Sequence, residues 1–201
     1  MNNLTDQELD EALNEALRRE DMDEFNRLGD EADRRATIRE ARLVAPGALR
    51  VAAEWYIGQG IAVFPLQPGG KVPATKHGFK DASTDLEQVR RWWAATPAAN
   101  IGLPTGGLFD VIDVDGEQGA RSHIHLTGTD LLPPIFGYAT TGRPCSRHLY
   151  IQATGDGNAA GLWPGIDYRG KGGYVVAPPS RTGRRYDWLH PLDVAGLKAG
   201  Q

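Results

Sequence analysis

The stretch Phe109-Asp110-Val111-Ile112-Asp113-Val114-Asp115-Gly116 combines β-branched residues with three aspartates. Its β-branched residues predict a β-strand. Successive side chains of a strand point to opposite faces, so Asp113 and Asp115 are predicted to share a face that Asp110 does not. Two carboxylates this close repel each other, and one would be pushed toward its neutral form unless a cation lies between them. Their hard oxygen atoms favour Mg²⁺ or Mn²⁺.

Two other motifs with similar residues are excluded by counting. A calcium loop of the EF-hand type that began at Asp113 would need a glutamate at its twelfth position, where Ile124 stands. Gly102 and Gly107 have the spacing of a phosphate-binding P-loop, but Leu108 replaces the required lysine. A strand end at which two acids meet solvent remains the alternative explanation of the Asp-x-Asp pair.

The charge of the chain is divided unevenly. The 201 residues have a formal net charge of −4. Residues 1–45 hold 7 Lys and Arg against 13 Asp and Glu, a net of −6, and the remaining residues hold 15 against 13, a net of +2. Basic residues gather after position 168, at Arg169, Lys171, Arg181, Arg184 and Arg185. We therefore expect an acidic segment joined to a mildly basic domain that can bind nucleic acid.

The composition, with 40% hydrophobic and 24% charged residues, is that of a globular protein with one main domain. No run is apolar enough to cross a bilayer, and the acidic N-terminus lacks the order of a secretory signal, so a cytoplasmic location is expected. The single cysteine, Cys145, cannot form an internal disulfide. It could join His123 and His125 in a zinc site, although a polar loop explains these two histidines more simply.

Two parts of the chain are predicted, an acidic helical extension over residues 1–45 and a main domain over residues 46–201. The extension is rich in Ala, Leu, Glu and Arg, and its first helix can be capped by Thr5. Three of its leucines recur near helical spacing, Leu9, Leu13 and Leu17. One or two surface helices are expected there, interrupted near Gly29, before Pro46-Gly47 marks the boundary.

The main domain is predicted to be an α+β domain with a mixed or antiparallel sheet. Helices are expected over residues 48–57, 85–95 and 117–125, with Thr84 as the cap of the second. Strands are expected over residues 61–66, 100–103, 108–115, 136–140, 148–152, 166–169 and 174–177. They outnumber the helices and do not alternate with long helices, as a doubly wound parallel sheet would require.

Two further strands carry polar residues in apolar surroundings. Ser146 and His148 are predicted to share a face of one strand, and Asp167 lies in the other. The chain thus has an Asp-x-Asp motif, then a histidine after a small residue, then a single acid. This order of motifs resembles that of the primase-polymerase family of the archaeo-eukaryotic primase superfamily. Three flanking stretches are also similar to that family: Lys71-Val72-Pro73, residues 100–106 and residues 167–180. The resemblance covers roughly residues 48–190.

The chain departs from the family pattern just before the histidine. The family usually has two glycines where Cys145 and Ser146 stand, so this loop is expected to approach a phosphate backbone less freely. The chain also lacks the cysteine set of the zinc-binding stem that some relatives carry.

The resemblance implies a nucleotidyltransferase of DNA replication, a DNA primase or DNA polymerase that uses two divalent ions, Mg²⁺ or Mn²⁺. Its implied catalytic residues and metal ligands are Asp113, Asp115 and Asp167. Its implied nucleotide-binding residues are His148, Ser146 and Arg169. The implied partners are a single-stranded DNA template and primer, nucleoside triphosphates and a helicase domain or protein, with no role for a membrane.

Two other functions stay open. A DNA-binding replication module without catalysis could keep the fold, but it would gain nothing from carboxylates that repel phosphate when no metal is bound. A metal-dependent nuclease or phosphohydrolase would use the same acids with water as the nucleophile. Aromatic residues near the third motif could stack on bases but are more simply explained as core residues: Trp163, Tyr168 and Tyr174.

Overall fold

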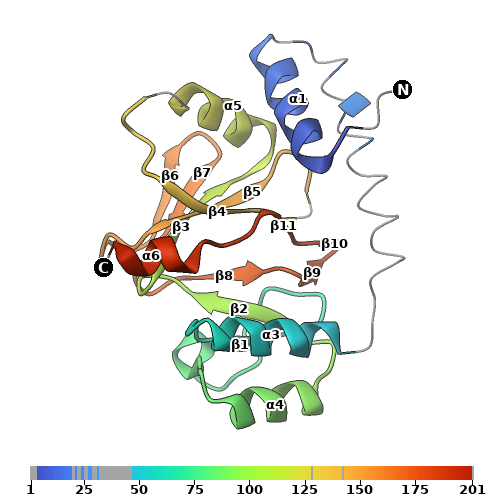
Figure 1. Ribbon diagram of the computed structural model, residues 1–201, viewed down its shortest axis with the longest axis vertical. Helices are drawn as coiled ribbons and strands as arrows, with labels where there is room; N and C mark the ends of the chain where they lie inside the picture. The colour runs from blue at the N-terminus through green and yellow to red at the C-terminus, as the bar shows by residue number, and fades with distance from the viewer. Residues whose placement is uncertain are drawn as a thin grey trace.

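The computed structural model describes residues 4–19, 21, 24, 27–28, 31, 47–127, 129–141 and 143–200. Figure 1 shows a layered molecule with helix α1 at one end, helices α3 and α4 at the other, and sheets between them. Among the described residues, no helix is both long and apolar enough to cross a membrane. The second helix expected before residue 45 falls largely outside the described residues.

The larger sheet has six antiparallel strands in the order β11-β4-β5-β3-β7-β6. Their bounds are Phe109–Val114 for β3, Ile135–Thr140 for β4, Arg147–Gln152 for β5, Ala159–Trp163 for β6, Ile166–Arg169 for β7 and Asp187–His190 for β11. Strand β3, the aspartate-bearing stretch, is central and pairs with β5 on one side and β7 on the other. The predicted α+β class is confirmed, in its antiparallel form.

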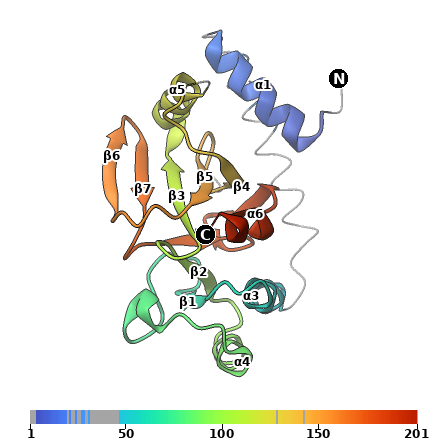
Figure 2. The same ribbon diagram turned by 60° about the vertical axis from the view of Figure 1, so that its left-hand side comes forward.

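A smaller antiparallel sheet joins β1 (Phe64–Leu66), β2 (Asn100–Pro104) and β8 (Tyr174–Ala177). Helices α3 (Ala48–Gly58) and α4 (Leu86–Ala95) lie beside this sheet, as Figures 1 and 2 show. A hairpin of two short strands, β9 (Arg181–Thr182) and β10 (Arg184–Arg185), follows β8.

The main hydrophobic core joins the smaller sheet, α3 and α4 to one face of the larger sheet. From β3 it takes Phe109 and Val111, which pack with Tyr150 of β5. Ile112 and Val114 point to the opposite face, which is covered by α5 (Gly116–Leu126). Strand β3 is therefore buried on both faces, with Asp113 on the same face as Val111.

Helix α1 (Asp6–Arg18) packs on α5 outside the sheets. Its buried Leu9 and Leu13 share a small cluster with Ala120 of α5. The N-terminus of α1 has a reciprocal cap: Glu8 N donates to Thr5 Oγ1 at 3.2 Å, and Thr5 N donates to Glu8 Oε2 at 2.6 Å. The predicted cap at Thr5 is confirmed.

The structure corrects several local predictions. Asp85 caps α4, with its Oδ1 accepting from Gln88 N at 2.6 Å, so the predicted cap at Thr84 is wrong by one residue. Strand β3 ends at Val114, which leaves Asp115 at the N-cap position of α5 instead of inside the strand. Elements that the sequence did not predict are β6, β9, β10, β11, the 3₁₀ helix η1 (Gly78–Asp81) and the final helix α6 (Val194–Ala199).

Candidate active site

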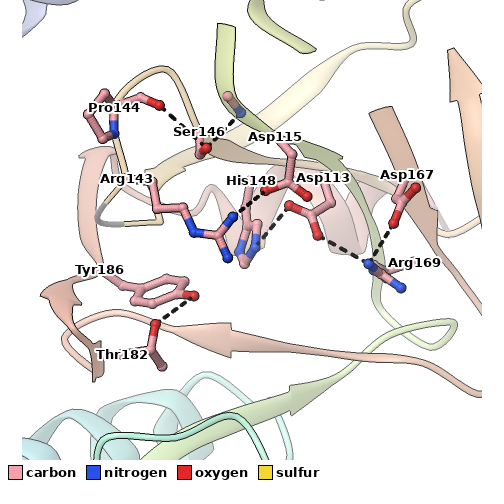
Figure 3. Close-up of polar contacts among 11 residues, drawn as sticks. Asp113, Asp115, Arg143, Pro144, Ser146, His148, Asp167, Arg169, Thr182 and Tyr186 are labelled. Carbon is pink, nitrogen blue, oxygen red and sulfur yellow. Dashed lines mark hydrogen bonds and ion pairs between the residues drawn. The ribbon is translucent and has the colours of Figure 1, made fainter. Parts of the chain in front are cut away.

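The register of the larger sheet places three of the expected site residues in one row. Asp113 of β3 lies opposite His148 of β5 on one side and opposite Asp167 of β7 on the other. Residues directly opposite each other in antiparallel strands point to the same face, so the three side chains are neighbours. Figure 3 shows this row, with Arg169 beside it. Residues far apart in the sequence thus form one polar site.

Arg169 joins the two acids of the row. Its Nη2 lies 2.8 Å from Asp167 Oδ2 and 3.4 Å from Asp113 Oδ2. The other oxygen of Asp167, Oδ1, accepts a hydrogen bond of 2.9 Å from the backbone of Gly161 in β6. The edge strand β6, which the sequence did not predict, therefore helps to fix the orientation of the third acid.

Asp115 lies at the edge of the row, just beyond the end of β3. Its side chain is 48% exposed, against 15% for Asp113, and its Oδ1 is 3.7 Å from Arg143 Nη1 on the loop between β4 and β5. Burial lowers the pKa of His148, and Asp115 is close enough for its negative charge to offset part of that effect. The two carboxylates of the Asp-x-Asp motif thus differ in their surroundings, one almost buried and one open to solvent.

The pKa of Asp113 is raised above its ordinary value. Burial is the main cause, because it removes the charged carboxylate from water. The positive charges of Arg169 and Lys71 oppose this effect, while the negative charge of Asp167 adds to it. A further cation beside Asp113 would favour the ionised carboxylate.

His148 is buried and neutral. Burial lowers its pKa to about 3, with smaller contributions from the charges of Lys71 and Arg169. Its Nε2 lies 3.5 Å from Asp113 Oδ1, and because the ring is uncharged this contact is a weak polar contact and not an ion pair. Its Nδ1 has no hydrogen-bond partner among the described residues. One buried nitrogen of the imidazole is therefore left without a hydrogen-bond partner among the described residues.

Ser146 ties the loop before β5 to the start of α5. Its Oγ accepts a hydrogen bond of 2.8 Å from the backbone of Gly116, directly after Asp115. The preceding residue, Cys145, has a φ of 60°, a left-handed conformation that glycine adopts with little strain. The chain thus keeps here the backbone geometry suited to glycine, although Cys145 and Ser146 stand where the family usually has two glycines.

Two residues of the row, Asp113 and His148, line a cavity of about 260 Å³ whose lining also includes residues that the motif analysis did not assign to the site. The lining comprises Lys71, Asp113, His148, Asn158, Arg169, Gly172, Gly173, Tyr174, Val175, Val176 and Tyr186. Lys71 was noted in the sequence only as part of a flanking stretch. Asn158 and Tyr186 carry no local pattern that could have placed them beside Asp113.

The donor chemistry of the site fits a hard divalent cation. Carboxylate oxygens are what Mg²⁺ and Mn²⁺ prefer, and Asp113 is an almost buried acid whose pKa is raised, mainly by burial. Within the described ranges, however, no three His, Cys, Asp or Glu side chains are grouped closely enough to hold an ion. The Arg169 guanidinium bridges Asp113 and Asp167, so a cation held by both acids requires this side chain to move.

The fold is an antiparallel α+β fold, and the charged residues that line its cavity are one acid, Asp113, and two cations, Lys71 and Arg169. Residues 53–199 match the family described as bifunctional DNA primase/polymerase, N-terminal, and the chain belongs to this family. The matched region begins within α3 and ends in α6, so it contains both sheets and the whole candidate site. Among curated proteins, none matches the sequence. The family identifies the chain as a DNA primase/polymerase domain.

Proposed function

We propose that this domain joins nucleotides to the 3′ end of a primer on a DNA template, by a reaction that uses two divalent ions. The observation that carries the proposal is the row of Asp113, His148 and Asp167 across β5, β3 and β7. It brings two acids and one phosphate-binding candidate to one face, at the mouth of a cavity. The family's primase and polymerase activity gives this row its substrates, nucleoside triphosphates and DNA.

In this proposal Asp113, Asp115 and Asp167 hold the ions, Mg²⁺ or Mn²⁺. When bound, such ions activate the primer 3′-hydroxyl and stabilise the charge on the α-phosphate and the leaving pyrophosphate. Asp115, which is half exposed, is placed to face the solvent side of the site, and Asp113 its buried side. Arg169 would leave the acids when a cation replaces it and would then be free to bind the triphosphate.

His148 is proposed to donate a hydrogen bond to a phosphate oxygen of the incoming nucleotide. A neutral imidazole has one N–H donor, and the burial of His148 holds the ring in one place beside Asp113. Ser146 was expected to contact the nucleotide. Its hydroxyl accepts a hydrogen bond from the backbone of Gly116, and in this way it supports the position of Asp115. Whether its hydroxyl also reaches a nucleotide stays a prediction.

Template and primer are proposed to bind as single-stranded or partly paired DNA along the basic residues that follow Asp167. The β9–β10 hairpin, which follows β8, carries Arg181, Arg184 and Arg185. Such contacts to phosphate carry little sequence information. Residues 1–45 are proposed to be a separate extension and residues 46–201 the catalytic domain, with a helicase as a partner in replication.

A gel assay with a 5′-labelled primer on a longer template tests this function. With deoxynucleotides or ribonucleotides and Mg²⁺ or Mn²⁺, we expect longer products and one pyrophosphate released for each nucleotide added. Shorter labelled products without pyrophosphate would identify a nuclease instead. Binding of DNA with neither product would identify a non-catalytic module.

A further inference from the structure

Lys71 lies across the candidate site from the carboxylates, on a segment that the motifs do not include. It belongs to the loop between β1 and η1, and its side chain is exposed and lines the same cavity as Asp113, His148 and Arg169. This loop packs on the smaller sheet, whereas the acids project from the larger one. The cavity therefore lies between a carboxylate side and a cationic side.

The backbone around Lys71 is held firmly by the smaller sheet. Its carbonyl accepts a hydrogen bond of 3.1 Å from the hydroxyl of Tyr174 in β8. The neighbouring carbonyl of Gly70 accepts one of 2.9 Å from Asn100 Nδ2 in β2. Gln67 N closes the turn by donating to Val72 O at 2.7 Å. A flexible lysine side chain is thus presented to the cavity from a fixed base.

Lys71 differs from the other two cations beside the acids. Arg169 contacts Asp113 and Asp167, and Arg143 contacts Asp115. Lys71 forms no ion pair with a carboxylate in the part of the chain that the structure describes. Its charge nevertheless reaches the site, where it opposes the burial that raises the pKa of Asp113 and adds to the burial that lowers the pKa of His148. An ammonium group beside the acids but unpaired is suited to an anion that enters the cavity.

The cavity wall near Lys71 suits a phosphate chain. Asn158 Oδ1 accepts a hydrogen bond of 3.0 Å from Gly170 N, which fixes the amide group at the wall. Gly172 and Gly173 bring bare backbone to the same wall, and a Cβ at Gly173 would lie 2.3 Å from Asn158 Oδ1. The wall is therefore polar and cannot accept a side chain at Gly173 without rearrangement.

We propose that Lys71 binds the β- and γ-phosphates of the incoming nucleoside triphosphate, on the side of the cavity opposite the carboxylates. The proposal rests on the proposed nucleotidyl transfer and adds a residue to it. The carboxylates and their ions must face the α-phosphate, where the bond breaks. The outer phosphates then extend away from the acids, toward Lys71, a cation without a carboxylate partner among the described residues. The bound nucleotide bridges the two sheets.

Binding titrations of the full chain test this assignment directly. The probe is a deoxyadenosine triphosphate with a non-hydrolysable imido link between its α- and β-phosphates, in the presence of Mg²⁺, with deoxyadenosine monophosphate as the comparison. Lys71→Ala should weaken triphosphate binding by about 10- to 100-fold, the loss expected for one charge-assisted contact, and change monophosphate binding by less than about twofold. Lys71→Arg should restore most of the affinity. In primer extension, KM for the nucleotide should rise more than kcat falls.

The matched control is Lys76→Ala. Lys76 lies on the same loop but lines a different cavity, with Thr75, Asp81, Gln88 and Trp92, and its loss should leave nucleotide affinity unchanged. Equal triphosphate affinity of wild type and Lys71→Ala would overturn the assignment and leave the proposed function intact. Weaker binding of DNA with unchanged triphosphate affinity would also overturn it, in favour of a DNA contact. A wild-type protein that binds no triphosphate would overturn the proposed function itself.

Discussion

Arg169 Nη2 lies 3.4 Å from Asp113 Oδ2, with the same nitrogen 2.8 Å from Asp167, so one guanidinium balances two acids from neighbouring strands. The arrangement explains how a nearly buried carboxylate such as Asp113 is tolerated beside a second acid. It also places an internal cation between two proposed metal ligands. Metal binding and the Arg169 contacts are therefore expected to compete.

Replacement of Arg169 by Gln tests this competition. We expect Arg169→Gln to lower the free energy of unfolding by about 1–2 kcal/mol without divalent ions, because two acids lose their shared partner. Added Mn²⁺ should restore the stability, and calorimetric titration without nucleotide should show tighter Mn²⁺ binding than in wild type. Arg91→Gln, on the exposed side of α4, is the matched control. Weaker Mn²⁺ binding in Arg169→Gln would contradict the competition.

DNA binding is expected to be weak, tolerant of sequence and strongly dependent on salt. About five basic residues cluster after Asp167, so we expect roughly three to five phosphate contacts. Each contact contributes about −0.9 on duplex, or about −0.7 on single strands, to the slope of log affinity against log salt concentration. Fluorescence anisotropy at several salt concentrations measures the slope. A flat response would show that stacking or base contacts dominate and would remove the β9–β10 hairpin from the interface.

A chain that begins at Pro46 tests the role of the acidic extension. Helix α1 contacts α5 through Leu9 and Leu13 and adds no strand to either sheet. The truncated protein is expected to fold and to extend primers at a rate similar to the full chain, with some loss of thermal stability because the α5 surface is uncovered. Insoluble protein would make the extension part of the core. A rate several-fold higher would show that the extension inhibits.

The central strands β3, β5 and β7 could be predicted from the sequence because β-branched and aromatic residues are concentrated in them. Strand β6 could not, since four of its five residues are exposed and its sequence contains glycine. The edge strand β11 is short and half-buried, and only its pairing with β4 defines it. The cap of α4 was misplaced by one residue because Thr84 and Asp85 are both good caps and only the backbone geometry chooses between them.

The acids and the histidine of the candidate site were predicted from their motifs, but their arrangement was not. That Asp113 lies between His148 and Asp167 depends on the register of three strands, which local sequence does not specify. Lys71 was missed as a site residue because its loop is held by the smaller sheet: Tyr174 donates to the carbonyl of Lys71, and Asn100 donates to the carbonyl of Gly70. No periodic pattern links it to the acids.

The buried His123 of α5 is expected to make stability depend on pH. Burial, aided by the charge of Arg147, lowers its pKa from 6.5 to about 4. Between these values the unfolded chain binds more protons than the folded one, so stability should fall as pH drops from about 6.5 to about 4. His123→Gln should remove part of that slope in thermal melts, and the exposed His125→Gln should not. Identical slopes for both variants would show that His123 does not contribute.

The most direct measurement of the central claim is primer extension by wild type and by the single variants Asp113→Asn, Asp115→Asn and Asp167→Asn. Each substitution removes one proposed metal ligand, and the exposed Asp130→Asn serves as the control. We expect extension and pyrophosphate release to fall by about 100-fold or more in each of the three, with circular dichroism unchanged and the control at wild-type rate. Near wild-type extension by any one of the three variants would contradict the assignment of that residue as a metal ligand. Near wild-type extension by all three would contradict the assignment of this site as the active site.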